Sequence, residues 1–165
     1  IALKMINTIL KLEDFTNKSV LDLYCGVGFF SIPMGKTAKS VLGVESEKIS
    51  FDLANENIIL NKVNNVKIIN GKVKETLRKL KDESRKFDIC LIDPPRFGCH
   101  ELIPEYLDKL NINKIIYISC NPATLARDLL RFAKEKYLLK DIILFDMFPR
   151  TYHVESISIL QLEDY

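Results

Sequence analysis

Several features are missing from this sequence, and each absence excludes a class of protein. No run of about 18 or more uncharged apolar residues occurs, so we expect no membrane-spanning helix. No basic segment followed by an apolar one opens the chain, so we expect no secretory leader. Internal repeats and low-complexity segments are also missing. A chain of 165 residues is long enough for one substantial core and too short for two ordinary domains, which predicts a single globular domain.

Cysteine patterning and net charge are weak signals as well. The four cysteines, Cys25, Cys90, Cys99 and Cys120, could form two disulfides, but they lack both metal-ligand spacing and the density of a secreted scaffold. We therefore expect reduced thiols, a cytoplasmic location and no bound metal. The formal net charge of +2 is small for a nucleic-acid-binding protein, whose phosphate contacts usually need clustered Lys and Arg. Composition by itself does not suggest RNA.

Apolar segments of strand length alternate with segments of helical periodicity. The first five are short, rich in Ile, Val and Leu, and without sustained alternation, which is typical of strands buried on both faces of a parallel sheet. The expected strands cover residues 19–24, 40–45, 66–70, 87–93, 114–120, 141–148 and 156–163, and the expected helices cover 2–13, 29–37, 47–62, 73–82, 100–110 and 122–136.

The connection between the last two strands is unusually short. Only about eight residues, 148–155, lie there, which is too few for a crossover helix, so the last strand should run antiparallel. The alternation elsewhere predicts right-handed crossovers. The sequence thus predicts an α/β fold with a mostly parallel seven-stranded sheet, an antiparallel last strand and helices on both faces.

A glycine turn follows the first strand. In LDLYCGVGFFSI (21–32), Gly26 and Gly28 lead directly into a helix, and glycine lets a backbone turn sharply and a ligand come close. A tight turn without a ligand is the alternative. Glu45 ends the second strand at a distance typical of a carboxylate that binds a ribose, although a helix N-terminus also favours such a charge. The two signals together favour an adenosine-containing ligand, and the missing third glycine argues against a dehydrogenase.

Three polar motifs follow the fourth, fifth and sixth strands. They are DPPRFG (93–98), SCNPATLARD (119–128) and FPRTYHVE (148–155). All fall at carboxyl ends of strands, which is the edge where an open parallel sheet binds ligands. Asp93 is either a turn residue or a contact to a base. Cys120 is either an inert buried thiol or a nucleophile at a helix start, where the helix dipole favours a thiolate.

A cysteine and a carboxylate on one edge suit chemistry at carbon 5 of uracil. That carbon is a poor nucleophile until a thiolate adds at carbon 6, and a base must then remove the carbon 5 proton to expel the thiolate. Glu155 is the candidate base, with a loop carboxylate paired to a cation such as Arg150 as the alternative. His153 is the rival base, although a loop histidine so near a strand more often serves packing.

The cofactor turn resembles that of the class I S-adenosylmethionine-dependent methyltransferases, which have a Rossmann-like seven-stranded sheet with an antiparallel last strand. The resemblance implies S-adenosyl-L-methionine as cofactor. Many members carry Gly-Asp after the third strand, where this chain has Gly71-Lys72, so no adenine contact is assigned to Lys72. The residues expected around the cofactor are Asp22, Gly26, Gly28 and Glu45.

The three polar motifs, in their order and spacing, resemble the signatures of the RNA 5-methyluridine methyltransferases. The resemblance covers nearly the whole chain. It implies Cys120 as nucleophile, Glu155 as general base and Asp93 as a contact to the target uracil. It also suggests that Arg127 and Asp128 support the cysteine loop, although Arg127 could equally be a surface charge. The implied partner is RNA, either tRNA or rRNA, with no membrane.

Other features of the family are missing from residues 1–165. Members usually carry an upstream Phe-x-Gln-x-Asn segment, many have an OB-like RNA-binding domain, and some hold an iron-sulfur cluster on N-terminal cysteines. We therefore expect residues 1–165 to be a single catalytic domain, the C-terminal part of a longer protein. The alternatives are an RNA cytosine-C5 methyltransferase, which would place a Pro-Cys after the fourth strand instead of Asp-Pro-Pro-Arg, and a noncatalytic module, which would have lost the cysteine or the glutamate.

Overall fold

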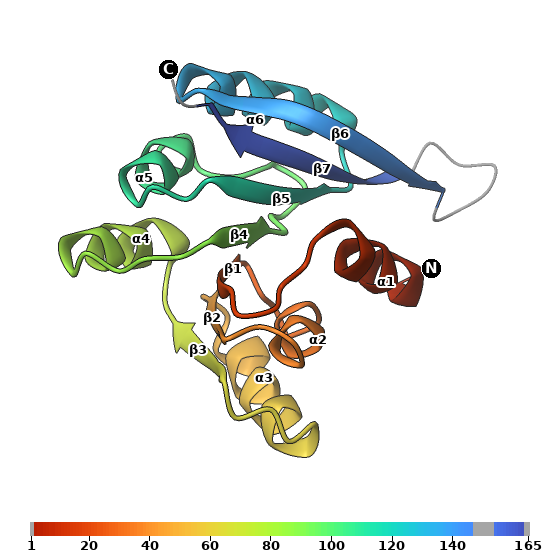
Figure 1. Ribbon diagram of the computed structural model, residues 1–165, viewed down its shortest axis with the longest axis vertical. Helices are drawn as coiled ribbons and strands as arrows, with labels where there is room; N and C mark the ends of the chain where they lie inside the picture. The colour runs from red at the N-terminus through yellow and green to blue at the C-terminus, as the bar shows by residue number, and fades with distance from the viewer. Residues whose placement is uncertain (1, 147–153, 164–165) are drawn as a thin grey trace.

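A computed structural model describes residues 2–146 and 154–163 of the chain. Within these residues, seven strands form one sheet and six helices cover it (Figure 1). The strands are β1 (Ser19–Leu23), β2 (Ser40–Glu45), β3 (Val66–Asn70), β4 (Ile89–Ile92), β5 (Lys114–Ser119), β6 (Tyr137–Asp146) and β7 (Val154–Leu162), and the helices are α1 (Ala2–Leu12), α2 (Ser31–Gly35), α3 (Lys48–Leu60), α4 (Val73–Asp82), α5 (Ile103–Lys109) and α6 (Pro122–Lys134).

The sheet has the strand order β3-β2-β1-β4-β5-β7-β6. Strands β1 to β5 pair in parallel, and β7 lies antiparallel between β5 and β6. The predicted α/β fold, with its antiparallel last strand, is confirmed. The order reverses between β1 and β4, and in open α/β sheets a ligand crevice forms at such a reversal, outside the carboxyl ends of the strands.

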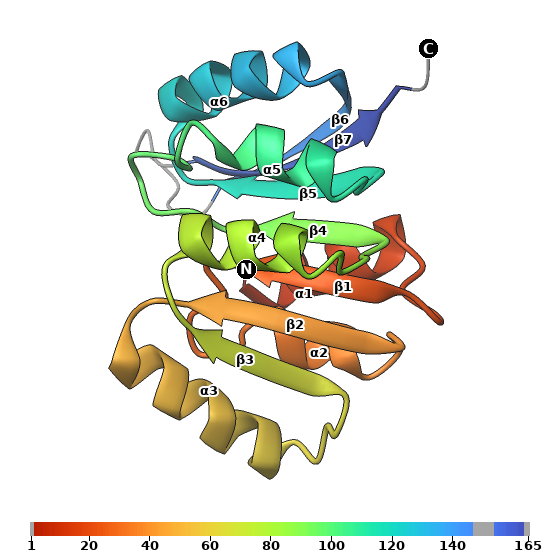
Figure 2. The same ribbon diagram turned by 90° about the vertical axis from the view of Figure 1, so that its left-hand side faces the viewer.

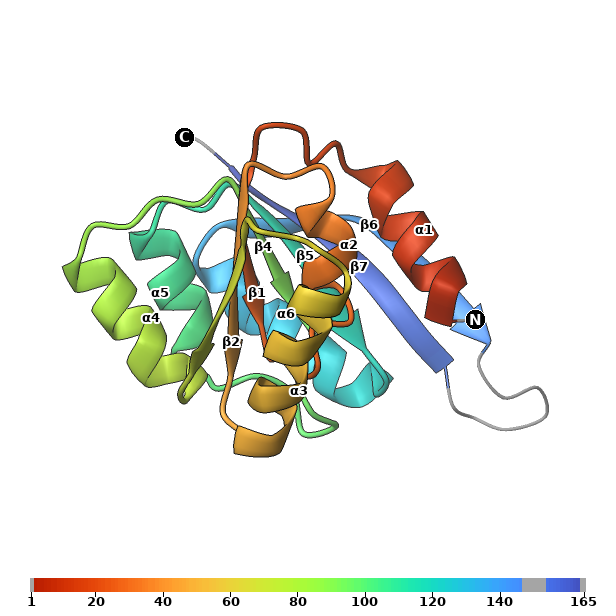
Figure 3. The same cartoon turned by 90° about the horizontal axis from the view of Figure 1, so that it is seen from below.

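Helices pack on both faces of the sheet. One core joins α4, α5 and α6 to one face, and a second core joins α1 and α2 to the other, where α3 also lies (Figure 3). Successive strand residues serve the two cores in turn: Leu21 and Leu23 of β1 belong to the first, and Val20 belongs to the second. This two-sided burial explains why the parallel strands read as continuous apolar runs.

Strand β6 begins earlier than the sequence predicted. It starts at Tyr137 instead of residue 141, and a bulge between Leu139 and Asp141 breaks its alternation. Tyr137 is buried, and its hydroxyl donates to the carbonyl oxygen of Ile112 at 2.7 Å. An extra residue at a bulge shifts the side-chain pattern by one. The first residues of this strand therefore lack the alternation that identifies a strand in the sequence.

The carboxyl ends of the parallel strands meet at one edge of the sheet, toward which the arrowheads of β2 and β3 point in Figure 2. Strand β7 begins at the same edge, because it runs antiparallel to β5. Strand β6 ends there, because it runs antiparallel to β7. DPPRFG, SCNPATLARD and the described end of the third motif, Val154 and Glu155, therefore lie at a common edge, and residues 148–153 lie outside the described residues. In the part of the chain that the structure describes, no helix is long and apolar enough to cross a membrane.

Candidate active site

The turn after β1 is built around two glycines with positive φ, 54° at Gly26 and 84° at Gly28. A Cβ added to Gly28 would lie 3.2 Å from the side chain of Ile32, whereas one added to Gly26 would meet nothing within 4 Å. The positive φ disfavours other residues at Gly28, and a Cβ there would also require the Ile32 side chain to shift by a few tenths of an ångström. Gly26 leaves open space beside the backbone, where a ligand can approach closely.

Glu45 joins the end of β2 to this turn. One oxygen of its carboxylate accepts a hydrogen bond from the backbone N–H of Gly26 at 2.9 Å, and the other accepts from the N–H of Glu47 at 2.7 Å. The first contact holds Glu45 against the glycine turn, and its predicted role as a cofactor contact stays a prediction. The second contact is with Glu47, the residue that precedes α3. The alternative interpretation, a carboxylate at a helix N-terminus, therefore applies to this second oxygen. Each oxygen keeps a lone pair for a further donor.

Asp22 lies in β1 directly under the turn and is fully buried. The Ser31 hydroxyl at the start of α2 donates to its Oδ2, while Oδ1 has no hydrogen-bond partner among the described residues. Burial raises the pKa of Asp22, the hydrogen bond from Ser31 opposes the rise, and the charges of Asp93 and Glu45 add to it, so that the pKa is about 7. A buried acceptor without a donor is unusual in a folded protein, and it marks a place where a ligand donor fits.

Asp93 follows β4 at the same edge. Its backbone N–H donates to the carbonyl oxygen of Leu23 at 3.2 Å, which continues the β1–β4 pairing by one residue. Burial, together with the charge of Glu155, raises the pKa of Asp93 to about 7. The two carboxyl groups named from separate motifs therefore lie close enough to interact.

Cys120 lies between β5 and α6 and is half-buried. The next residue, Asn121, caps the helix: its side-chain oxygen accepts from the N–H groups of Ala123 at 3.0 Å and Thr124 at 3.4 Å. The Ser119 hydroxyl accepts from the N–H of Asn121 at 3.1 Å. These bonds fix the turn on both sides of the thiol, because an N-cap side chain satisfies donors that the first helical turn leaves free.

Strand pairing brings Glu155 to Cys120. The last pair of the β5–β7 ladder joins Ser119 to Ser156. Cys120 follows Ser119 and Glu155 precedes Ser156, so each lies one residue beyond this pair at the same end of the ladder. Glu155 also pairs with Phe145 of β6. Burial raises the pKa of Glu155, and the positive charge of Arg96 opposes that rise. His153 and Arg150, the other residues considered in this motif, lie outside the described residues.

A pocket of about 480 Å³ opens beside the glycine turn. Sequence reasoning identified none of its aromatic walls. Phe97 comes from the loop after β4 and is 73% exposed, and its place within the DPPRFG motif was the one signal for it in the sequence. Lys72, to which no adenine contact was assigned, is part of the wall. The lining residues are Tyr24, Ser46, Lys72, Val73, Lys74, Glu75, Phe97, Cys99 and His100.

The structure corrects one expectation. Arg127 and Asp128 were expected to support the cysteine loop, but their side chains bind the loop after β4 instead. The Asp128 carboxylate accepts from the N–H of Cys99 at 2.8 Å, and Arg127 donates to the carbonyl oxygen of Phe97 at 2.6 Å. Both residues lie in the second turn of α6, seven and eight residues after Cys120, where their side chains meet the loop after β4.

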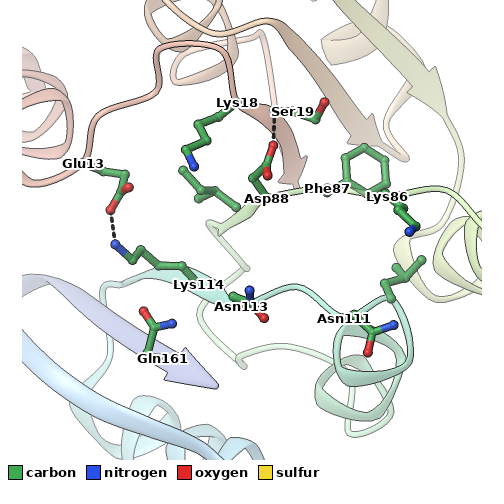
Figure 4. Close-up of a pocket in the computed structure, with 12 residues that line it drawn as sticks. Glu13, Lys18, Ser19, Lys86, Phe87, Asp88, Asn111, Asn113, Lys114 and Gln161 are labelled. Atoms are coloured by element: carbon green, nitrogen blue, oxygen red, sulfur yellow. Dashed lines mark hydrogen bonds and ion pairs between the residues drawn. The ribbon is translucent and has the colours of Figure 1, made fainter. Parts of the chain in front are cut away.

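A second pocket, of about 500 Å³, lies at the opposite edge of the sheet (Figure 4). Ser19 and Lys114, the first residues of β1 and β5, line it. Its carboxylates are engaged: Glu13 pairs with Lys114 at 2.6 Å, and Asp88 accepts from the N–H of Ser19 at 2.7 Å. No cysteine lines it. The amino-end pocket therefore lacks the chemistry found at the carboxyl edge.

Comparison with known proteins is consistent with a methyltransferase fold. A family model described as tRNA (uracil-5-)-methyltransferase matches residues 1–163. An uncharacterized RNA methyltransferase of Staphylococcus aureus strain N315 is 40% identical over 161 residues, which are 97% of this chain and 35% of that protein. One from Caldanaerobacter subterraneus subsp. tengcongensis is 41% identical over 148 residues, covering 90% and 32%.

Among solved structures, the Pyrococcus abyssi tRNA (uracil-54, C5)-methyltransferase in complex with S-adenosyl-L-homocysteine is 32% identical, with a TM-score of 0.80. The match covers 96% of this chain and 38% of that one. The chain thus spans about a third of the length of the relatives that it matches.

Proposed function

The chain belongs to the tRNA (uracil-5-)-methyltransferase family, and from this premise we propose that it transfers a methyl group from S-adenosyl-L-methionine to carbon 5 of a uridine in RNA through a covalent bond to Cys120. The observation that carries the proposal is the β5–β7 register, which sets Glu155 one step beyond the Ser119–Ser156 pair and thus beside the cysteine. A nucleophile and a base in that relation are what the reaction needs.

The residues around the glycine turn fit S-adenosyl-L-methionine. This cofactor carries a sulfonium and an ammonium, and it supplies the methyl group on its sulfur. The unpartnered Oδ1 of Asp22 is a buried acceptor suited to the ammonium. The free lone pairs of Glu45 suit the ribose hydroxyls. The pocket that contains Tyr24 and Phe97 offers aromatic surface to the adenine.

Cys120 opens the reaction. As a thiolate, its Sγ adds to carbon 6 of the uracil, and the electrons of the 5,6 double bond move toward the carbonyl at carbon 4. Carbon 5 becomes nucleophilic in this way and could accept the methyl group that bound S-adenosyl-L-methionine would supply. The Asn121 cap and the Ser119 hydroxyl hold the thiol in one place for this attack.

Glu155 closes the reaction. Its carboxylate removes the proton from carbon 5, the C–H electrons re-form the double bond, and the Cys120 thiolate leaves. Because burial raises the pKa of Glu155, the carboxylate is a stronger base than an exposed glutamate. Asp93, whose pKa is about 7, can donate to a uracil oxygen when protonated and accept from N3–H when ionised.

The substrate is an unpaired or easily opened uridine, because carbon 6 of a stacked base is out of reach of a side chain at a sheet edge. Family membership favours uracil over cytosine, and tRNA or rRNA is the proposed RNA. The chain spans about a third of its relatives' length and has a small net charge. We therefore assign most of the phosphate contacts to the rest of the complete protein.

Incubation of the complete protein with S-adenosyl-L-methionine and RNA containing 5-fluorouridine tests this function. Fluorine at carbon 5 cannot leave as a proton, so a methylated adduct that survives denaturing electrophoresis should accumulate. With ordinary RNA, nucleoside analysis should find 5-methyluridine. A protein that forms no adduct and methylates no uridine would overturn the proposal.

Cofactor affinity should depend on pH through Asp22. The ammonium of the cofactor needs the ionised carboxylate, and the pKa of Asp22 is about 7 before binding. Affinity should therefore fall as the pH drops through 7, with the dissociation constant about tenfold higher one unit below the pKa. Isothermal titration calorimetry between pH 5.5 and 7.5 measures this slope.

Asp22 and Asp93 both have a pKa near 7, so one variant of each is needed to decide which carboxyl group causes the pH dependence of cofactor binding. Asp22→Asn should weaken binding and remove the pH dependence. Asp93→Asn should keep the pH dependence, because Asp93 faces the uracil in the proposed mechanism. A slope that survives in Asp22→Asn would contradict the assignment of the ammonium to Asp22.

A further inference from the structure

A fully buried carboxylate outside the reacting groups ties three segments together. Asp128 of α6 has no exposed surface, and its Oδ2 accepts from the N–H of Cys99 at 2.8 Å and from the Tyr117 hydroxyl at 2.7 Å. Its Oδ1 accepts from Arg127 at 2.8 Å and from Arg131 at 3.1 Å. Burial raises the pKa of Asp128, but these hydrogen bonds outweigh burial and lower it, so the group is an ionised hub.

The two arginines bind the same loop as the carboxylate. Arg127 donates to the carbonyl oxygen of Phe97 at 2.6 Å, and Arg131 donates to that of Cys99 at 3.4 Å. Gly98, between them, has a φ of 82°, and a Cβ there would lie 2.3 Å from both the Arg127 guanidinium and the Asp128 carboxylate. The loop therefore rests directly on the charged cluster, with no room for a side chain between them.

The other side of this loop is the wall of the cofactor pocket. Phe97, Cys99 and His100 line the pocket of about 480 Å³ beside the glycine turn. The first turn of α6 also holds the loop, because the Thr124 hydroxyl donates to the carbonyl oxygen of Arg96 at 3.2 Å. One helix thus begins directly after the nucleophile and fixes a wall of the pocket with its second turn.

We propose that Asp128 is a positioning residue that sets the pocket wall formed by residues 97–100 at a fixed place relative to Cys120, and so controls how tightly S-adenosyl-L-methionine binds. This proposal rests on the proposed function. Without the carboxylate, the N–H of Cys99 and the Tyr117 hydroxyl lose their acceptor, and the two arginines keep only the carbonyl oxygens of the loop. The loop can then satisfy the buried N–H of Cys99 only by moving. The thiol keeps its own support, because the Asn121 cap does not involve Asp128.

The variant Asp128→Asn in the complete protein tests the proposal. Loss of hydrogen bonds to a charged group typically changes an equilibrium by about tenfold or more, so the dissociation constant for S-adenosyl-L-methionine should rise by at least about tenfold. RNA affinity should change less than twofold. Saturating cofactor should restore most of kcat, so that the loss falls on the KM for the cofactor. Asp52→Asn, which removes an exposed carboxylate on α3, is the control and should change neither constant.

A matched pair of tyrosines separates positioning from plain stability. Tyr117 and Tyr137 both pack edge-to-face on Phe132, at 5.9 and 5.8 Å, and each donates one buried hydrogen bond of 2.7 Å. The acceptor is Asp128 for Tyr117 and the carbonyl of Ile112 for Tyr137. The two Tyr→Phe variants should unfold at similar temperatures, yet only Tyr117→Phe should weaken cofactor binding, by about threefold or more.

These outcomes decide the proposal even if Asp128→Asn fails to fold. Equal cofactor affinity in Tyr117→Phe and Tyr137→Phe overturns it, as does unchanged affinity in a folded Asp128→Asn. A wild-type protein that binds no S-adenosyl-L-methionine would contradict the proposed function instead. A wild-type protein that binds the cofactor, with variants that bind it equally well, would contradict only the role of Asp128.

Discussion

Replacement of Cys120 by alanine should abolish methyl transfer, with kcat reduced on the order of 10⁴-fold or more, because carbon 5 of uracil has no other route to a reactive state. Cys120 is half-buried at the sheet edge, and the variant removes one sulfur atom while the Asn121 cap stays in place. Cofactor affinity should therefore be unchanged. Transfer of labelled methyl groups to RNA measures the first effect, and calorimetry measures the second.

Cys90→Ala is the matched control. Cys90 lies in β4 and is also a cysteine that carries no disulfide, but it is fully buried in the core. Its variant should lose some stability to the cavity left behind and keep its activity. Trapping with 5-fluorouridine RNA should fail only in Cys120→Ala. An adduct that still forms in Cys120→Ala would place the nucleophile elsewhere.

The fold was predictable because two simple patterns decide it. Continuous apolar strands such as β4 require burial on both faces, and the short connection after β6 forces an antiparallel last strand. The start of β6 was not predictable, since the bulge between Leu139 and Asp141 shifts the pattern that identifies a strand. The direction of the side chains at this bulge is set by the pairing with β7, and a short stretch of sequence around β6 does not contain β7.

The common edge of the site residues was also predictable, because parallel strands all end on one side of a sheet. Asp93, Cys120 and Glu155 each follow or begin a strand there. The roles of these residues, and the cofactor contacts of Asp22, Gly26, Gly28 and Glu45, stay predictions. The burial that raises the pKa of Asp22 could not be read from the sequence, since it depends on the packing of α2 against β1.

The pocket walls were beyond sequence reasoning for a different reason. The loop that carries Phe97 and His100 has no periodic pattern, and its path is set by contacts with Arg127 and Asp128 about thirty residues later. The SCNPATLARD motif therefore contains two kinds of residue. Its first half shapes the nucleophile turn, and its last two residues shape the loop of the neighbouring strand.

Replacement of Glu155 by glutamine should stop the reaction after methyl transfer and trap the enzyme on its RNA. The glutamine side chain has the size of glutamate but cannot accept the carbon 5 proton, so carbon 5 is methylated and the Cys120 thiolate cannot leave. Multiple turnover should fall by about 10²- to 10⁴-fold, the usual contribution of a general base. A methylated covalent complex should accumulate with ordinary RNA, at up to one labelled methyl group per enzyme molecule. Denaturing electrophoresis and intact-mass measurement detect it.

Glu163→Gln is the matched control, because Glu163 follows the other end of β7 and pairs with Lys140 at 2.8 Å, far from the carboxyl edge. That variant should turn over freely and trap nothing. His153 is the competing base in the same motif, and the comparison with His153→Gln decides between them. If Glu155→Gln releases its product while His153→Gln retains a methylated complex, proton removal belongs to His153. Retention by Glu155→Gln alone means that Glu155 removes the proton in the last step of the reaction. The pairing of β5 with β7 then has a catalytic consequence, because it sets this glutamate beside Cys120.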